Sequence, residues 1–253
     1  MSLNLMVMIP THSGQMETVT AETLLQLQRE MLARKGQMTL RVHSGSVIST
    51  LRNAMVADFL GSDADTLLML DADQGISGQG LMRMIDFDAP VVGCLYPKRQ
   101  FDWRHVRADE PAGDMSRILN QAQAFVGEVA AGVDGTTVTR NGFAQALHVG
   151  TGILVIRRSA LQTLMEACPD LKGAGFSPEE FTGPRFAQNW GFFNLLARTE
   201  GGGTYSEDYS FCQRWRDAGQ TLWADVMTPT VHVGRQVFSG SYLDHVRSVE
   251  PPV

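Results

Sequence analysis

In the first hundred residues, segments with the apolar pattern of a strand alternate with segments with the apolar spacing of a helix. Four segments have the short apolar or alternating pattern of strands: residues 5–10, 39–43, 66–70 and 90–96. Three segments have the helical spacing of three and four residues: 17–34, 47–60, which reads as amphipathic, and 80–85. This order of elements predicts an α/β fold with a mostly parallel, doubly wound sheet. Ligands of such a sheet are expected at the carboxyl ends of its strands.

The pattern is more irregular after residue 99. The polar segment 100–113 predicts a loop, and short strand candidates follow within 124–149. A firmer strand at 152–156 leads into a helix at 158–167, and another helix is expected from Ser206 to about Ala218. Because no repeat or linker interrupts the chain, we expect a single domain over residues 1–253, with halves at 1–99 and 100–253.

Residues 169–203 form a long stretch of weak periodicity, rich in glycine, proline and aromatic residues. Such stretches are usually functional or mobile. Trp190, Phe192 and Phe193, followed by the glycines at 201–203, suit a lid over an acceptor sugar. Local packing of these aromatic side chains explains the composition equally well.

Composition and charge narrow the class of protein. The chain has 253 residues, 43% of them hydrophobic and 19% charged, which is ordinary for a globular protein. Its net charge of −6 argues against a nucleic-acid partner. Three cysteines without metal-ligand spacing give no disulfide framework, and no apolar run approaches the roughly 18 residues of a transmembrane segment. We therefore expect a cytoplasmic protein without a membrane span.

Two aspartates, Asp71 and Asp73, follow the apolar strand at 66–70 directly. Carboxylates at i and i+2 of an extended chain point the same way and face one cation. Mg²⁺ and Mn²⁺ prefer oxygen ligands, and Mg²⁺ is usually held by one or two carboxylates together with substrate phosphates. A divalent metal site is one interpretation of the pair. The other is a polar turn at the end of the strand, which Asp73 caps just before Gly75.

A second acidic pair, Glu207 and Asp208, follows Ser206 at the start of the late helix. Ser206 is a plausible N-cap, and acidic residues in a first turn are favoured by the helix dipole, so structure alone explains the pair. His232 lies between two valines about twenty residues later. Its imidazole is a competent Mn²⁺ ligand, although a histidine in this setting is more often a core residue.

Seven segments together, in this order, resemble the nucleotide-sugar-dependent glycosyltransferases of the GT-A fold, especially the family 2-like group. They are MIPTHSG (8–14), STLRNAMVADFL (49–60), LMLDADQGI (68–76), VVGCLYPKR (91–99), GTGILVIRRSAL (150–161), SEDYSFCQRW (206–215) and VHVG (231–234). The resemblance implies a GT-A-type sheet with a nucleotide-sugar-binding half at 1–99 and an irregular acceptor-side half at 100–253.

The resemblance also implies roles for the donor-side residues. Pro10 and Thr11 would border the base and ribose, and Arg52 would meet the nucleotide or brace the D-x-D loop. Asp71 would lie near the ribose and the water shell of a Mn²⁺ or Mg²⁺ ion, and Asp73 would bind that ion directly.

On the acceptor side, His232 would complete the metal shell. Asp208 would act as the general base on an acceptor hydroxyl, and Glu207 would support it or contact the acceptor. The implied reaction moves a sugar from a nucleoside-diphosphate sugar to a hydroxyl of a carbohydrate or other acceptor.

Departures from the family pattern leave alternatives. CQRW at 212–215 is not the full Q-x-x-R-W of processive synthases, and no transmembrane helix follows, so a non-processive enzyme is expected. A metal-dependent nucleotidyltransferase would need a glycine- and lysine-rich phosphate loop, whereas PTHSGQ at 10–15 has one glycine and no lysine. A non-catalytic sugar-nucleotide-binding protein is the third possibility.

Overall fold

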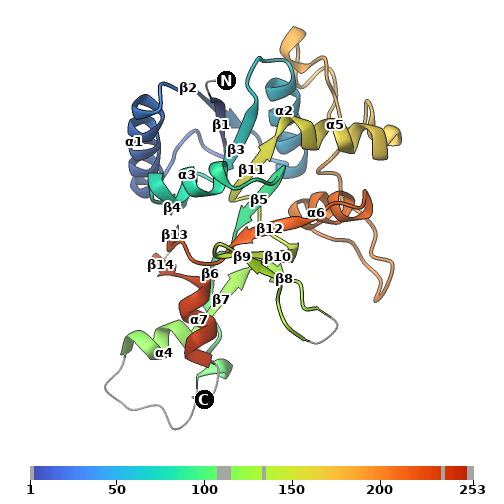
Figure 1. Cartoon of the computed structure of the whole chain (residues 1–253). Coiled ribbons are helices and arrows are strands. Elements are labelled where there is room, and N and C mark those ends of the chain that lie inside the picture. Colours follow the sequence, from blue (N-terminus) through green and yellow to red (C-terminus); the bar gives the residue numbers. More distant parts are fainter. Residues whose placement is uncertain (1–2, 107–114, 133–134, 235–236, 250–253) are drawn as a thin grey trace.

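A nine-stranded sheet forms the centre of the molecule in the computed structural model, which describes residues 3–106, 115–132, 135–234 and 237–249 (Figure 1). The strands in spatial order are β2 (Gln37–Ser44), β1 (Asn4–Thr11), β3 (Thr66–Leu70), β11 (Ile153–Arg157), β5 (Val91–Cys94), β12 (Leu222–Asp225), β10 (Phe143–His148) and β8 (Glu128–Val129). The short β9 (Thr139–Arg140) pairs with β10.

The sheet is mixed rather than wholly parallel. Strands β2, β1 and β3 run parallel, and β5 and β12 run parallel to each other. Strand β11 is antiparallel to both of its neighbours, β3 and β5, and β10 is antiparallel to β12. Because β1, β2 and β3 are parallel to one another, their carboxyl ends lie together at one edge of the sheet.

Helices cover both faces of this sheet. The helix α1 (Thr18–Ala33) and the helix α3 (Gly78–Asp86) pack on one face, with Leu27 and Leu81 in the same apolar cluster. The other face is covered by α2 (Ile48–Leu60), α5 (Arg158–Ala167) and α6 (Glu207–Asp217). Alternate residues of β1 serve the two layers, because successive side chains of a strand point to opposite faces.

The helix α2 differs from the amphipathic helix predicted at 47–60. Every residue from Leu51 to Phe59 is buried, including Arg52, Asn53 and Asp58. A helix that is buried on all sides must pair its polar side chains inside the protein, because an unpaired buried polar group is costly. The polar residues of α2 are therefore the ones that connect it to distant parts of the chain.

A second region lies beside the edge of the main sheet (Figure 1). The predicted strand at 90–96 divides into β5 and β6 (Tyr96–Phe101), and β6 pairs with β7 (Gln123–Val126). The sequence pattern did not reveal the other elements there: β4 (Gln74–Ile76), β13 (Thr230–Val233), β14 (Val237–Gly240), α4 (Met115–Ala122) and α7 (Tyr242–Val249). A short 3₁₀ turn, Trp103–His105, lies within the expected loop at 100–113, of which residues 107–113 lie outside the described residues.

The segment at 169–203 has two short 3₁₀ turns, Pro169–Leu171 and Pro184–Phe186, and is anchored to α2. Asn53 donates from Nδ2 to the Gly175 carbonyl and accepts at Oδ1 from the Phe193 amide. Trp190, Phe192 and Phe193 are buried in the core. The structure thus favours local packing, and these aromatic side chains are not available as a sugar-binding lid.

Two further observations concern the class of protein. In the described parts of the chain, no helix is long and apolar enough to cross a bilayer. The three cysteines, Cys94, Cys168 and Cys212, are all free thiols, as expected from their spacing.

Candidate functional site

A cleft of about 890 Å³ opens at the carboxyl ends of β1, β2 and β3. Its lining includes residues from each strand end: Pro10 and Thr11, Gly45 and Ser46, and Asp71 to Asp73, together with Arg52 and Arg99. This is the edge where ligands of an open α/β sheet bind. The structure therefore brings together all the predicted donor-side residues, Pro10, Thr11, Arg52, Asp71 and Asp73, in one cavity.

The two aspartates of the D-x-D motif do not face one point. Ala72 and Asp73 form a turn closed by a hydrogen bond from the Gln74 amide to the Asp71 carbonyl, 3.2 Å long. The i and i+2 rule holds for an extended chain, so the turn separates the two carboxylates. Asp71 faces Arg52 and Asp73 faces Arg99. The positive charges beside the acidic pair are therefore two arginines of the chain itself.

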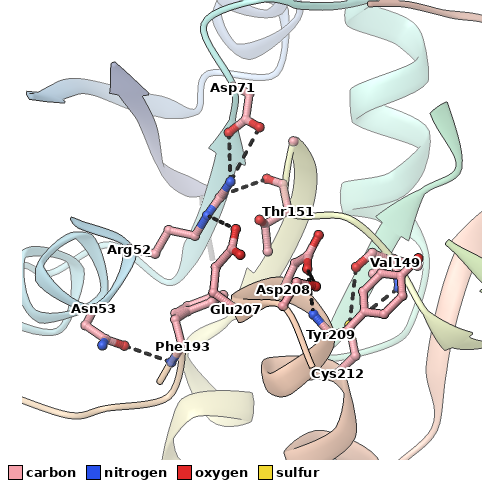
Figure 2. A network of polar contacts seen from close by, with 12 residues as sticks. Arg52, Asn53, Asp71, Val149, Thr151, Phe193, Glu207, Asp208, Tyr209 and Cys212 are labelled. Atoms are coloured by element: carbon pink, nitrogen blue, oxygen red, sulfur yellow. Dashed lines mark hydrogen bonds and ion pairs between the residues drawn. The ribbon is translucent and has the colours of Figure 1, made fainter. Parts of the chain in front are cut away.

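Arg52 connects the donor side of the cleft to the start of α6, as Figure 2 shows. Its Nη2 donates to the two oxygens of Asp71 at 3.2 and 3.4 Å, and its Nη1 donates to the Thr151 carbonyl at 3.3 Å. Its Nε lies 3.5 Å from Oε1 of Glu207. Arg52 thus contacts both the D-x-D loop and the first turn of α6.

Arg52 is 4% exposed, so its charge depends on these carboxylates. Burial works against the charged form, but Asp71 and Glu207 outweigh it and raise the pKa of Arg52 above its ordinary value. The guanidinium Nε and the Thr151 hydroxyl have no hydrogen-bond partner within the described structure. Buried polar atoms of this kind usually have a partner, so this corner is suited to a polar ligand group or a bound water.

His232 lies against Asp73, although β13 and the D-x-D turn are far apart in the sequence. Strand β13 pairs with β4, which begins directly after Asp73, and this register brings the His232 Nε2 atom to 3.5 Å from Asp73 Oδ2. The His232 Nδ1 atom lies 2.8 Å from the Pro97 carbonyl oxygen. Because a carbonyl only accepts, Nδ1 carries a proton, and Nε2 is the ring nitrogen that faces Asp73.

This arrangement fits a divalent cation. Metal-binding histidines almost always donate their other ring N–H to a carbonyl or a carboxylate, which fixes the tautomer. Two acceptor atoms that face each other need a cation or a proton between them. No group of three His, Cys, Asp or Glu side chains able to hold a metal occurs among the described residues, and Asp71 is not grouped with Asp73 and His232. The protein would thus supply one carboxylate and one imidazole, and the remaining ligands would be phosphate oxygens and water.

The first turn of α6 directs Glu207 at Arg52, whereas Asp208 contacts the Tyr209 amide (Figure 2). Ser206 is the N-cap residue, but its hydroxyl makes no capping bond and donates instead to Asp208 Oδ1. The Tyr209 amide also donates to Oδ1, at 2.8 Å. Within the described structure Oδ2 of Asp208 receives no hydrogen bond, so it can accept one from a ligand.

Glu207 has a different environment. Burial raises its pKa, the neighbouring Arg52 lowers it, and the negative charges of Asp208 and Asp71 raise it further, so that the pKa lies above its ordinary value. The side chain is directed at Arg52 rather than at open solvent. Its place in the structure is that of a partner for the buried arginine.

Sequence reasoning missed Arg99 and the Pro97 carbonyl. Both belong to the VVGCLYPKR segment, which was noted only as a strand and a basic turn. A basic residue just after the predicted strand at 90–96 was the available signal. Cys212, which lies within α6, hydrogen-bonds with Val149. Burial raises its pKa to about 12, so it is not a reactive thiol.

No protein-family model matches the chain, and a comparison with curated proteins finds no match. Among solved structures, A197 from STIV is similar over 96% of this chain and 92% of its own, with 13% identity and a TM-score of 0.45. Mannose-1-phosphate geranyltransferase from Thermus thermophilus covers 97% of each chain, with 12% identity and a TM-score of 0.43. UDP-glucose pyrophosphorylase in complex with UDP-glucose covers 98% of this chain and 97% of its own, with 7% identity and a TM-score of 0.40.

These similarities are distant and carry no inference about the reaction. The fold itself is α/β with a mixed, largely parallel central sheet, as the sequence predicted. The neighbours include a protein named as a transferase and another solved with a nucleotide sugar bound.

Proposed function

We propose that this protein is a metal-dependent, non-processive glycosyltransferase, which moves a sugar from a nucleoside-diphosphate sugar to a hydroxyl of a carbohydrate or other acceptor. The observation that carries the proposal is the pair of Asp73 and His232, with Nε2 3.5 Å from Oδ2 beside a strand-end cleft. The pair is suited to Mn²⁺ or Mg²⁺, and the cleft is large enough for a nucleotide.

In this proposal the nucleoside lies along Pro10 and Thr11, and its diphosphate points toward Asp73. The divalent cation, when bound, supplies positive charge that stabilises the nucleoside-diphosphate leaving group. Arg52 holds Asp71 and Glu207 in place, so that the donor side of the cleft and the first turn of α6 keep a fixed relation. Fixed positions of this kind lower the cost of bringing reacting groups together.

Asp208 serves as the general base that takes the proton from the acceptor hydroxyl. Its Oδ1 atom is held by Ser206 and Tyr209, while Oδ2 is left for the acceptor. Glu207, occupied by Arg52, is a positioning residue. The burial of Trp190, Phe192 and Phe193 means that the acceptor is bound by other side chains than these.

The test is to incubate the full chain with Mn²⁺ and a panel of nucleotide sugars and to measure release of free nucleoside diphosphate. We expect turnover with one base, and a loss in kcat of about 10²- to 10⁴-fold in Asp208→Asn. Asp217→Asn, at the other end of α6, is the matched control and should retain activity.

Other outcomes separate the alternatives. Release of pyrophosphate from a nucleoside triphosphate and a sugar phosphate would identify a nucleotidyltransferase. Binding of nucleotide sugars without turnover would identify a binding protein.

A further inference from the structure

We propose that Arg99 and the divalent cation compete for Asp73, and that Arg99, once displaced, binds the diphosphate of the donor. The inference rests on the proposed function and adds a coupling between metal binding and nucleotide binding. It concerns a side chain to which the family resemblance gives no role.

The competition follows because Arg99 and His232 both contact the same oxygen of Asp73. Arg99 Nη1 lies 3.0 Å from Asp73 Oδ2, and the same Oδ2 atom lies 3.5 Å from His232 Nε2. A cation held between Asp73 and His232 would therefore meet the guanidinium at close range. Like charges at such a distance repel, so the ion pair between Arg99 and Asp73 must open when the cation binds.

Arg99 is able to move. It lies on the exposed part of β6, and its side chain is 55% exposed, whereas that of Arg52 is 5% exposed. Its stem passes close to Gly234, where an added Cβ would come within 2.8 Å of Arg99 Cδ. The glycine that ends the VHVG segment thus leaves room for this arginine beside the metal-binding histidine.

The new position of Arg99 is set by the cleft, which it lines together with Thr11, Arg52 and Asp73. Among the described residues, the cleft lining has two arginines and no lysine: Arg99 is exposed and Arg52 is buried. A guanidinium presents a planar fork of donors that matches phosphate oxygens. Displaced from Asp73, it therefore faces the space that the diphosphate occupies in the proposed function.

The consequence is cooperative binding. The cation releases Arg99 for the diphosphate, and the diphosphate holds Arg99 away from Asp73. By thermodynamic linkage, the nucleotide must then tighten cation binding by the same factor as the cation tightens nucleotide binding. The arrangement keeps Asp73 neutralised in the empty enzyme and favours joint binding of the cation and the donor.

The experiment measures Mn²⁺ binding by the loss of the free-ion electron paramagnetic resonance signal, with and without a nucleoside diphosphate chosen from ADP, CDP, GDP and UDP, after subtraction of the signal that the nucleotide alone removes in protein-free samples. In Arg99→Gln we expect Mn²⁺ alone to bind about two- to fivefold more tightly, the factor typical of an exposed ion pair. In the presence of Mn²⁺ the diphosphate should bind about tenfold more weakly, since a charge-assisted hydrogen bond is lost. Cooperativity between the two ligands should decrease but not disappear, because the phosphate oxygens also coordinate the cation.

Lys98→Gln is the matched control, because it removes the same charge from the adjacent exposed position of β6. It should leave Mn²⁺ affinity unchanged. The inference is overturned if Arg99→Gln leaves Mn²⁺ affinity unchanged or weakens it, or if Lys98→Gln has the same effect as Arg99→Gln.

The same titrations separate this inference from the proposed function. If wild type binds Mn²⁺ and Asp73→Asn loses it, while Arg99→Gln shows no tightening, only the role of Arg99 fails. If wild type binds no Mn²⁺ in the presence of any of the four diphosphates, the metal-dependent function fails together with it.

Discussion

Two strand ends of the central sheet carry aspartates that pair with arginines, and they use their carboxylates differently. Asp225, at the end of β12, is completely buried and accepts four hydrogen bonds. Arg83 Nη1 donates at 2.5 Å, the Thr228 hydroxyl at 2.6 Å, and the amides of Met227 and Thr228 at 2.9 and 3.0 Å. Little capacity is left for a ligand.

Asp71 and Asp73, after β3, contrast with Asp225. Their side chains are 27% and 28% exposed, each faces one arginine, and the bonds from Arg52 to Asp71 are long. These carboxylates keep lone pairs directed at the cleft. The comparison shows that an ion pair between an aspartate and an arginine does not by itself tell whether the aspartate can bind a ligand. Whether the carboxylate is saturated separates a structural ion pair from one that is ready for a ligand.

The comparison predicts opposite costs for removing the two kinds of aspartate. Asp225→Ala leaves Arg83 without its buried partner and three donors unpaired, so we expect a loss of about 3–5 kcal/mol in the free energy of unfolding. Asp73→Ala, at a partly exposed position, should cost less than about 1 kcal/mol. Urea unfolding of both variants measures the difference, and equal losses would show that saturation is not the distinguishing property.

The second prediction concerns Mn²⁺ binding and sharpens the contrast within the D-x-D motif. His232→Phe and Asp73→Asn should each weaken Mn²⁺ binding by at least about tenfold, because each removes one of the two proposed protein ligands. Asp71→Asn should weaken it by less than about threefold, since Arg52 and not the cation site holds that carboxylate. Isothermal titration calorimetry on the three variants provides the measurement. If Asp71→Asn matched Asp73→Asn, both carboxylates would have to turn toward the ion.

The sequence predicted the elements with continuous periodic patterns better than the contacts between segments that are far apart in the chain. Strands and helices with continuous periodic runs were predicted within a few residues, among them β1, α1, β3, α5 and α6. The strand-end cleft followed from their order. The pairing of β13 with β4, which brings His232 to Asp73, joins short strands that are far apart in the sequence and leaves no periodic signal. Only the family resemblance connected these two residues.

The burial of Arg52 and Asn53 could not be predicted from the sequence for a different reason. Apolar spacing in α2 gave the helix correctly, but not its burial on all sides, because spacing does not report which neighbours cover the polar positions. A charged residue among Leu51, Ala54 and Met55 was the available signal. The Asp71–Asp73 turn was missed because the i and i+2 argument assumed an extended chain.

The smallest predicted effect concerns Glu207, which is intermediate between the two kinds of carboxylate: it is largely buried, and its contact with Arg52 is long, at 3.5 Å. Its pKa is raised in the folded protein, chiefly by burial, so the folded state binds the proton more tightly than the unfolded state. Stability should therefore fall as pH rises from the unfolded pKa of Glu207 through its raised folded pKa. Glu207→Gln cannot ionise and should lack this contribution.

The free energy of unfolding of Glu207→Gln relative to wild type should accordingly increase with pH across that window and become constant above it. Urea unfolding at a series of pH values measures this difference, with Glu166→Gln on the exposed side of α5 as the control. A difference that decreases with pH would mean that Arg52 outweighs burial at this carboxylate. Glu207 would then be a carboxylate held in its ionised form by Arg52.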